Sequence, residues 1–272
     1  MTAAKPQGWV DAHTHLLPLR LTGAIRRFFF EHLAVTFGYP ADPFQARDVL
    51  RAAGFEGCWS LPYAHKAGMA SALNRWMAEA FQNDGFVSPG ATVHPDDDVE
   101  AVVREATETL GLRLFKVHCS VGNFSPDDLR LEPLYAVSAE RGMPIVIHLG
   151  MAIDGNTAGA DLEPLDRTLL RHARARIILA HLGAPSVLES LALMRKHPGL
   201  LADLTPVVHG TVPLAAGALH GLSERVLYGS DIPNTLVPME AAQAQVGRLG
   251  LDATGLSRVM GGNARSILQG VT

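Results

Sequence analysis

Two histidines and an aspartate alternate along a short apolar segment near the start of the chain, Val10-Asp11-Ala12-His13-Thr14-His15. If this segment is a β-strand, the three side chains share one face, because successive side chains of a strand point to opposite sides. Two imidazoles one pleat apart can reach a single small cation, and imidazole is a common ligand of zinc and related divalent ions. A His-x-His pattern also occurs in proteins without a metal, so residues elsewhere in the chain must show whether this pair belongs to a metal site.

Two more apolar segments end in histidine, at His148 and His181, and a third is followed by a carboxylate, Asp231. In a barrel of parallel strands, the carboxyl ends of the strands meet at one mouth, where the active site lies. Histidines that merely fill a core would have no reason to fall at the same place on three segments. The pattern therefore predicts one metal site of imidazole and carboxylate ligands, with an open position for the substrate.

A lysine lies in another predicted strand, Leu114-Phe115-Lys116-Val117-His118, where alternation places Lys116 and His118 together on the inner face. A buried lysine is costly unless it is neutral, modified or paired. Three roles stay open for Lys116: an ion pair with Asp11 or another inward acid such as Asp203, binding of a substrate carboxylate, or carbamate formation that bridges a second metal. Asp203 is also placed to orient a ligand histidine.

Eight short segments rich in Val, Ile and Leu position these residues, and their composition predicts strands buried on both faces. They are Trp9–His13, Gly57–Leu61, Val87–Val93, Arg113–Val117, Pro144–His148, Arg176–His181, Leu200–Leu204 and Arg225–Ser230. The amphipathic segments between them carry helix signals, such as the acidic start at Asp96–Asp98 and the stop at Gly142. Eight strand–helix units predict an α/β chain that forms one (β/α)8 TIM barrel over residues 1–272. The alternative, an open doubly wound sheet, lacks a Gly-x-Gly-x-x-Gly after the first strand.

Composition narrows the function classes. The chain has 272 residues, 47% of them hydrophobic, and a net charge of −4, which excludes global disorder and gives no reason to expect nucleic acid or membrane partners. No apolar run reaches the roughly 18 residues that cross a bilayer, and the first residues lack the pattern of a secretory signal. Two cysteines, Cys58 and Cys119, cannot form a disulfide framework. We therefore expect a cytoplasmic protein that acts on a small molecule.

Taken together, these motifs resemble the amidohydrolase superfamily, in particular the branch typified by aminocarboxymuconate-semialdehyde decarboxylase and pyrone-dicarboxylate lactonase. The resemblance covers nearly the whole chain. It is carried by Asp11-x-His13-x-His15, His148, His181-Leu-Gly, Gly229-Ser230-Asp231, Asn74-Arg-Trp-Met-Ala-Glu, Gly142-Met-Pro-Ile-Val-Ile-His148 and Gly261-Gly262-Asn263-Ala264-Arg265.

The resemblance implies a ligand set. One divalent ion, most often zinc, would be held by His13, His15, His148 and Asp231. His181 would contact the water or the substrate beside the ion. In binuclear relatives a carboxylated lysine, here Lys116, and His181 bind a second metal. We expect one ion and leave the second open, and the branch also contains metal-free lactonases.

The expected activity is a metal-dependent hydrolase of a lactone, amide or ester of a small carboxylic acid. A bound metal lowers the pKa of water from ~15.7 towards ~7, which supplies the nucleophile. His181 or Asp231 would carry the proton, and His181 is preferred because a carboxylate bound to a cation is a weak base. The alternative is a non-oxidative decarboxylase or hydratase of a small unsaturated or aromatic acid. A phosphoesterase or nuclease is disfavoured by the acidic charge, and a non-catalytic barrel by the intact ligand positions.

The sequence specifies the substrate contacts less clearly than the metal ligands. The residues that could reach a substrate from strand ends or from the first long connection are Lys116, His118, His65, His94 and Arg20. That connection, residues 16–41, is long for a compact domain, so we expect an active-site loop there. The sequence leaves open whether the chain forms a homo-oligomer.

Overall fold

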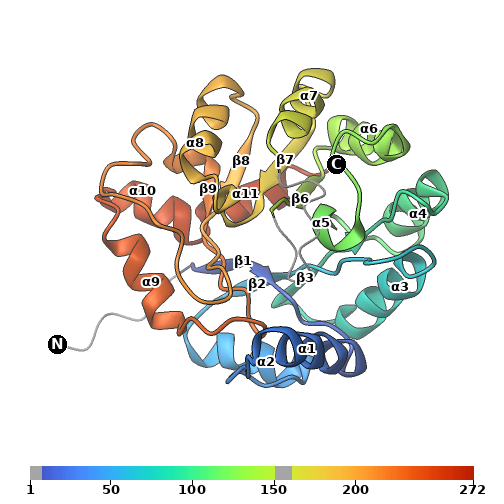
Figure 1. The fold of residues 1–272 in the computed structure, drawn as a ribbon, viewed down its shortest axis with the longest axis horizontal. Coiled ribbons are helices and arrows are strands. Elements are labelled where there is room, and N and C mark those ends of the chain that lie inside the picture. The colour runs from blue at the N-terminus through green and yellow to red at the C-terminus, as the bar shows by residue number, and fades with distance from the viewer. Residues whose placement is uncertain (1–7, 151–160) are drawn as a thin grey trace.

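The computed structural model describes residues 8–150 and 161–272, and it contains parallel strands surrounded by helices (Figure 1). The strand segments are β1 (Val10–Thr14), β2 (Gly57–Ser60), β3 (Val87–Pro89), β4 (Ala91–Thr92), β5 (Phe115–His118), β6 (Pro144–His148), β7 (Arg176–Leu179), β8 (Leu201–Asp203) and β9 (Val226–Leu227). They pair in parallel as β1-β2-β3 and as β4-β5-β6-β7-β8-β9.

The segments β3 and β4 are one strand interrupted at Gly90. The amide of Gly90 donates to the carbonyl of Ser60 in β2, whereas the amide of Ala91 donates to the carbonyl of Leu114 beside β5. The backbone therefore changes partner at Gly90, where a Cβ atom would lie 3.0 Å from the Ser60 carbonyl oxygen. With β3 and β4 counted together, the part of the chain that the structure describes has the eight strands that the sequence predicts.

The two sheets close where the last strand meets the first. The amide of Ala12 donates to the carbonyl of Tyr228 at 2.9 Å, and the amide of Asp231 donates to the carbonyl of His13 at 2.9 Å. These bonds join the end of β9 to β1 and complete the ring of strands. The prediction of a (β/α)8 barrel is confirmed, and an open sheet is excluded.

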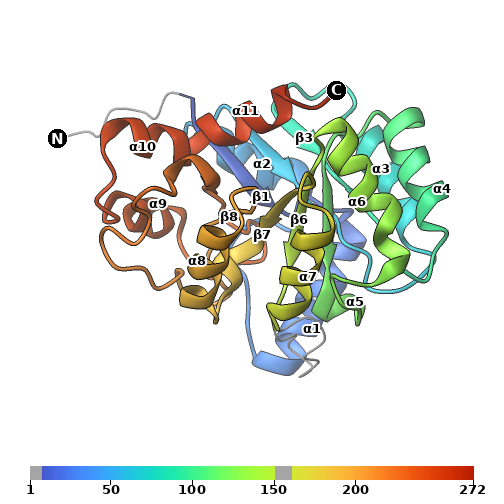
Figure 2. The same cartoon turned by 90° about the horizontal axis from the view of Figure 1, so that it is seen from above.

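Helices surround the ring of strands, and α11 lies at the end opposite α1 (Figure 2). They are α1 (Leu19–Leu33), α2 (Pro43–Ala52), α3 (Ala70–Phe81), α4 (Val99–Arg104), α5 (Cys119–Gly122), α6 (Glu132–Arg141), α7 (Glu163–Arg171), α8 (Val187–Lys196), α9 (Met239–Gly247), α10 (Ala253–Ser257) and α11 (Asn263–Gln269). Local signals explain several boundaries. Asp98 caps α4 by accepting a hydrogen bond from the amide of Ala101, and Gly142 ends α6 with φ of 68°. No helix in the described ranges is both long and apolar enough to cross a membrane.

Alternation along the strands separates two packing layers. In β6, Ile145 and Ile147 belong to the large cluster between strands and helices, whereas Val146 belongs to a smaller cluster with residues of β1, β2, β7 and α11. In β5 the same alternation sends Phe115 and Val117 to the large cluster. Lys116, which lies between them, is therefore on the opposite face and is fully buried.

The segment expected as an active-site loop, residues 16–41, contains a regular helix. The 15-residue α1 ends at Ala34, whose φ of 53° is left-handed. In this fully described helix only Thr22 is buried, so α1 packs lightly on the barrel. One of its anchors is Arg26, whose guanidinium donates to the carbonyls of Tyr39 and Pro233.

Candidate active site

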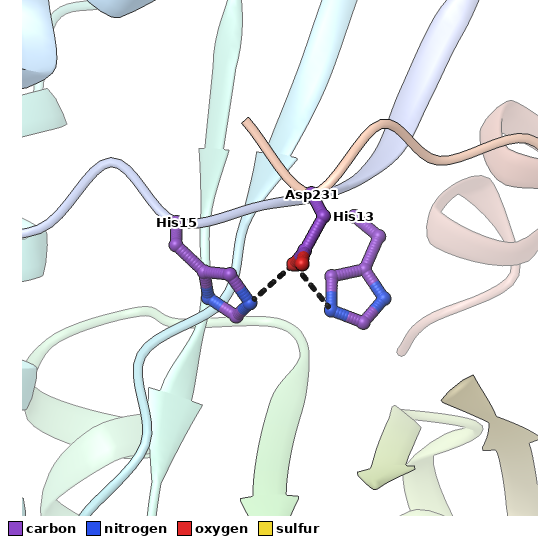
Figure 3. Close-up of side chains that lie close together, drawn as sticks. All are labelled: His13, His15 and Asp231. Carbon is purple, nitrogen blue, oxygen red and sulfur yellow. Dashed lines mark ion pairs between the residues drawn. The ribbon is translucent and has the colours of Figure 1, made fainter. Parts of the chain in front are cut away.

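His13, His15 and Asp231 meet at the carboxyl ends of β1 and β9, the two strands that close the barrel. Figure 3 shows the carboxylate of Asp231 between the two imidazole rings. Its Oδ1 atom lies 3.1 Å from Nε2 of His15 and 3.8 Å from Nε2 of His13. All three residues are buried, and one potential ligand atom from each lies within 4.8 Å of the others. This arrangement can hold one divalent cation.

Hydrogen bonds on the far side of each ring prepare the two histidines as ligands. Nδ1 of His13 donates to Oδ2 of Asp203 at 2.9 Å, and Nδ1 of His15 donates to the carbonyl of Leu61 at 2.6 Å. Because a carbonyl or a carboxylate only accepts, both rings carry their proton on Nδ1. Their Nε2 atoms therefore face Asp231, and each can bind a metal when that nitrogen carries no proton.

The environment keeps His13 neutral. Burial lowers the pKa of His13 to about 3, with a further lowering by the positive charge of Lys116. Nζ of Lys116 lies 3.4 Å from Nε2 of His13. Burial also lowers the pKa of Lys116 to about 8, although the charges of Asp203 and Asp231 act in the opposite direction. Lys116 therefore contacts the cluster through His13, and it is not among the residues that line the cavity described below.

A second histidine pair lies next to the cluster. Nδ1 of His181 lies 3.1 Å from the Thr205 carbonyl and donates there, so in the neutral ring Nε2 is an acceptor. Nε2 of His181 lies 3.1 Å from Nδ1 of His148, which then donates and leaves Nε2 of His148 with a free lone pair. His148 has the tautomer that a ligand needs. The compact cluster nevertheless contains three of the four expected ligands, and His148 lies beside it, against His181.

Asp11 does not join the cluster, contrary to the simple alternation expected from the sequence. The register of β1 against β2 shifts between Asp11 and Thr14, so side chains do not alternate regularly there. Oδ1 of Asp11 instead accepts hydrogen bonds from the amides of His13 and Ser230. Asp11 therefore ties together the backbones that carry the metal-site residues.

Two site residues have strained backbone. Asp231 has φ of 65° and His181 has φ of 53°, in the left-handed region that non-glycine residues rarely adopt. Two backbone hydrogen bonds hold the turn at Asp231. The amide of Asp231 donates to the His13 carbonyl, and the amide of Asn234 donates to the Asp231 carbonyl. Backbone strain that neighbouring hydrogen bonds maintain is common in active sites. It gives a side chain a direction that an unstrained backbone would not give it.

A cavity of about 620 Å³ opens over the cluster. Its polar wall is formed by His15, Tyr63, His65, His118, His148, His181, Asp231 and Asn234. The apolar part of the lining comes in part from α1, with Leu21, Ala24, Ile25, Phe28 and Phe29, and in part from loops after other strands, among them Leu149, Pro185 and Val207. Among the described lining residues there is no lysine or arginine.

The predicted substrate contacts divide into two groups. His65 and His118 line the cavity, and the ring of His118 stacks on His148 at 3.7 Å between centroids. His94 and Arg20 do not line it: Nε2 of His94 lies 3.1 Å from the Gly122 carbonyl, and Arg20 is exposed at the start of α1. Lys116 lies beneath the cluster.

Sequence reasoning missed Tyr63, Asn234 and the inner face of α1. Asn234 follows Asp231 by three residues, so its place after a predicted strand was a usable signal. The ring of Tyr63 lies 5.4 Å from that of His15, between centroids, and also follows a strand end. For α1, the aromatic run Phe28–Phe30 was visible, but its orientation depends on packing.

Solved structures support the fold. An uncharacterised TIM-barrel protein from Bordetella bronchiseptica is 20% identical over 96% of this chain and 98% of its own, with a TM-score of 0.75. A 5-carboxyvanillate decarboxylase from Sphingomonas paucimobilis is 15% identical over 98% and 100%, with a TM-score of 0.69. A dihydroxybenzoic acid decarboxylase from a Polaromonas species, with bound manganese and the inhibitor 2-nitroresorcinol, is 12% identical over 97% of each chain, with a TM-score of 0.70. At these identities the likeness shows a shared barrel.

Sequence comparison assigns the family. None of the curated proteins matches this chain. The model of a family described as amidohydrolase matches residues 10–269, which include both histidines of β1, His148, His181 and Asp231. The chain therefore belongs to the amidohydrolase family.

Proposed function

We propose that this protein is a metal-dependent decarboxylase of a small aromatic carboxylic acid. The observation that carries the proposal is the lining of the cavity, which brings aromatic and aliphatic side chains of α1 together with His15 and Asp231 of the cluster. An aromatic ring gains by leaving water for such a wall, while its acid group can face the cluster. Two of the structural neighbours are decarboxylases of aromatic acids.

This proposal takes the alternative that the sequence left open, in place of hydrolysis. Both reactions use the same ligand residues, so the motifs alone favour neither. The cavity supports decarboxylation because its wall suits a ring, and the described lining offers no lysine or arginine for a second acid group.

The residues fit one divalent ion. His13, His15 and Asp231 would hold it, and we propose His148 as the fourth ligand through Nε2. When bound, the ion would fix the position of the substrate's acid group. Zinc and manganese both accept imidazole and carboxylate ligands, and one neighbour binds manganese.

His181 is the proposed proton carrier. It lines the cavity, and its ring lies 5.0 Å from that of His13, between centroids. Hydrogen bonds from Nδ1 to backbone carbonyls stabilise the ring when Nε2 is also protonated. For this step the hydrogen bond between Nε2 of His181 and Nδ1 of His148 would have to open, because His148 is the donor in it. Nε2, once protonated, would give its proton to the ring carbon that bears the carboxyl group. The bond to the carboxyl carbon then breaks, its electron pair returns to the ring, and carbon dioxide leaves.

The two cysteines bear on the cellular compartment in which we propose that the protein works. Cys58 and Cys119 are both buried and unpaired, which supports work in a reducing compartment such as the cytoplasm. The substrate is a small molecule in this proposal, and Arg20 and His94 have no part in binding it.

A direct assay separates decarboxylation from hydrolysis. Chelator-treated protein is reloaded with Mn²⁺ or Zn²⁺ and offered a panel of hydroxybenzoates, lactones, esters and amides. We expect carbon dioxide from at least one aromatic acid and none from chelated protein. Hydrolysis of a lactone, ester or amide without any release of carbon dioxide would overturn the proposal.

The proton carrier is tested with a matched pair of histidines. We expect His181→Asn to keep its metal and to lose about 10²–10⁴-fold in kcat, the usual contribution of a positioned acid or base. His94→Asn changes a histidine that is also buried but lies outside the cavity lining, and should retain kcat.

A further inference from the structure

Asn234 is a buried amide on the cavity wall. It lies in the turn after β9, where its backbone amide donates to the carbonyl of Asp231 at 2.9 Å. The side chain lines the cavity, and the residue is only 5% exposed. The turn that aims Asp231 at the cluster therefore also fixes Asn234 a short distance along the same wall.

The amide of Asn234 has unused hydrogen-bonding capacity. Neither Oδ1 nor Nδ2 has a partner among the residues that the structure describes, and both atoms are buried. Burial of an amide without hydrogen bonds is costly, and the great majority of buried polar groups are paired. A group that bound in the cavity would remove this cost, so the unpaired amide indicates a recognition site.

The surroundings determine the charge of that group. Besides histidines, Tyr63 and Asp231, the described residues that line the cavity are apolar, and none is lysine or arginine. Arg26, on the same helix as the apolar wall, is turned to the carbonyls of Tyr39 and Pro233. A second carboxylate at Asn234 would be buried without a lysine or arginine to pair with it, which is unfavourable.

We propose that Asn234 selects substrates by binding a neutral hydrogen-bonding substituent, a hydroxyl on the ring, while the acid group lies at the metal site. An amide offers one acceptor and two donor hydrogens, and a hydroxyl can donate to Oδ1 and accept from Nδ2. The inference rests on the proposed function and narrows its substrate class to hydroxylated aromatic monocarboxylic acids. Acids with a second carboxylate are excluded.

Binding measurements test this assignment without relying on turnover. Metal-loaded protein is titrated calorimetrically with benzoate, the three monohydroxybenzoates and a benzenedicarboxylate. Wild-type protein should bind one hydroxybenzoate about tenfold to a hundredfold more tightly than benzoate, the range expected for pairing a buried amide. It should bind the dicarboxylate more weakly than benzoate.

Two variants remove the amide, and a third serves as a control. Asn234→Leu keeps the volume and Asn234→Ala reduces it, so at least one should leave the fold intact, as judged by metal content and thermal unfolding. Both should lose the preference for the hydroxybenzoate while benzoate affinity changes less than about threefold. Val207→Ala changes an apolar residue of the same cavity and should weaken both acids alike.

The outcomes separate the two proposals. The role of Asn234 is overturned if the wild-type protein binds benzoate and every hydroxybenzoate with equal affinity. It is also overturned if the Asn234 variants lose affinity for benzoate and hydroxybenzoate to the same extent. Tight hydroxybenzoate binding that depends on Asn234, without any release of carbon dioxide, overturns the proposed reaction and keeps the recognition site. Absence of binding by any aromatic acid overturns both.

Discussion

The carboxylate of Asp203 joins His13 to the segment that carries His181. Oδ2 accepts the Nδ1 proton of His13 at 2.9 Å, and Oδ1 accepts the backbone amides of His181 and Thr205 at 2.9 and 3.1 Å. Burial alone would raise the pKa of Asp203, but its interaction with His13, including the hydrogen bond from Nδ1, holds the pKa well below the usual range. Asp203 is therefore ionised, and it determines which nitrogen of His13 faces the metal site.

Asp203→Asn should weaken metal binding by about 10- to 100-fold, the usual effect of losing a group that orients a metal ligand. Asparagine can still accept from the two amides through Oδ1, but its NH2 group would face Nδ1 of His13 and favour a proton on Nε2. Competition with a chromogenic chelator measures the affinity. Asp48→Asn, on an exposed carboxylate, is the control, and an affinity equal to that of wild type in Asp203→Asn would refute the orienting role.

Asp231→Ala and His13→Ala should each reduce the metal content from about one ion per chain to background, because each removes one of three clustered ligands. Elemental analysis after dialysis measures the content. His148→Ala then tests the fourth ligand: we expect an affinity loss beyond the ~100-fold limit typical of residues that only orient a ligand. A smaller loss would place His148 outside the ligand set.

Gly229→Ala should destabilise the fold and disturb the metal site, because the added methyl group would collide with His13. A Cβ atom at Gly229 would lie 2.6 Å from Cβ of His13 and would also collide with the Thr205 side chain, so the backbone of one of them must move. We expect a loss of about 1–3 kcal/mol in the free energy of unfolding, as for other overpacked sites, and weaker metal binding.

The control for that variant is Gly247→Ala, at the end of α9. Nothing lies within 4 Å of a Cβ atom there, so its stability should stay within about 0.5 kcal/mol of wild type. Thermal unfolding and metal titration of both variants make the comparison. Wild-type metal affinity in Gly229→Ala would show that His13 tolerates the displacement.

Asp84 should stabilise the fold in a pH-dependent way. Burial raises the pKa of Asp84, but hydrogen bonds from the Phe86 amide and the Arg47 guanidinium outweigh it, so the pKa lies below its ordinary value of 3.8. A lowered pKa means that the stabilisation is complete above that ordinary value and is lost as the pH falls through the folded-state pKa. Asp84→Asn should therefore cost about 1–3 kcal/mol at pH 7, and the difference should shrink below about pH 4.

Urea unfolding at pH 7 and pH 3 measures this effect. Asp48→Asn is a matched control, because Asp48 pairs with the same Arg47 but is 59% exposed at its side chain, and it should cost less than about 1 kcal/mol. A difference between wild type and Asp84→Asn that stays constant from pH 7 to pH 3 would contradict the role of the ionised carboxylate.

The barrel was predictable because its signals are local. Each strand is a short apolar run, and residues such as Gly142 and Asp98 mark helix ends through their own backbone chemistry. Gly90 shows a limit of this reasoning. The segment 87–93 reads as one strand, and only the neighbouring Ser60 and Leu114 carbonyls reveal that its partner changes midway.

The candidate site was less predictable, because it depends on distant contacts. Alternation placed Asp11 with the histidines, but the register shift in β1 removes it from the cluster. No rule of spacing could indicate the left-handed backbone of Asp231, which depends on its bond to His13. The choice between hydrolysis and decarboxylation was open for the same reason: it rests on the cavity wall, and that wall comes from how α1 packs.

The light packing of α1 has a consequence for how this enzyme could diversify. The proposed metal-binding and proton-transfer residues stand on the barrel, whereas five apolar residues of the cavity wall belong to a helix with one buried residue, Thr22. Exchanges at Phe28 or Phe29 could therefore reshape the cavity at little risk to folding or metal affinity. Mutation and selection can work on substrate preference and on chemistry as two nearly independent traits.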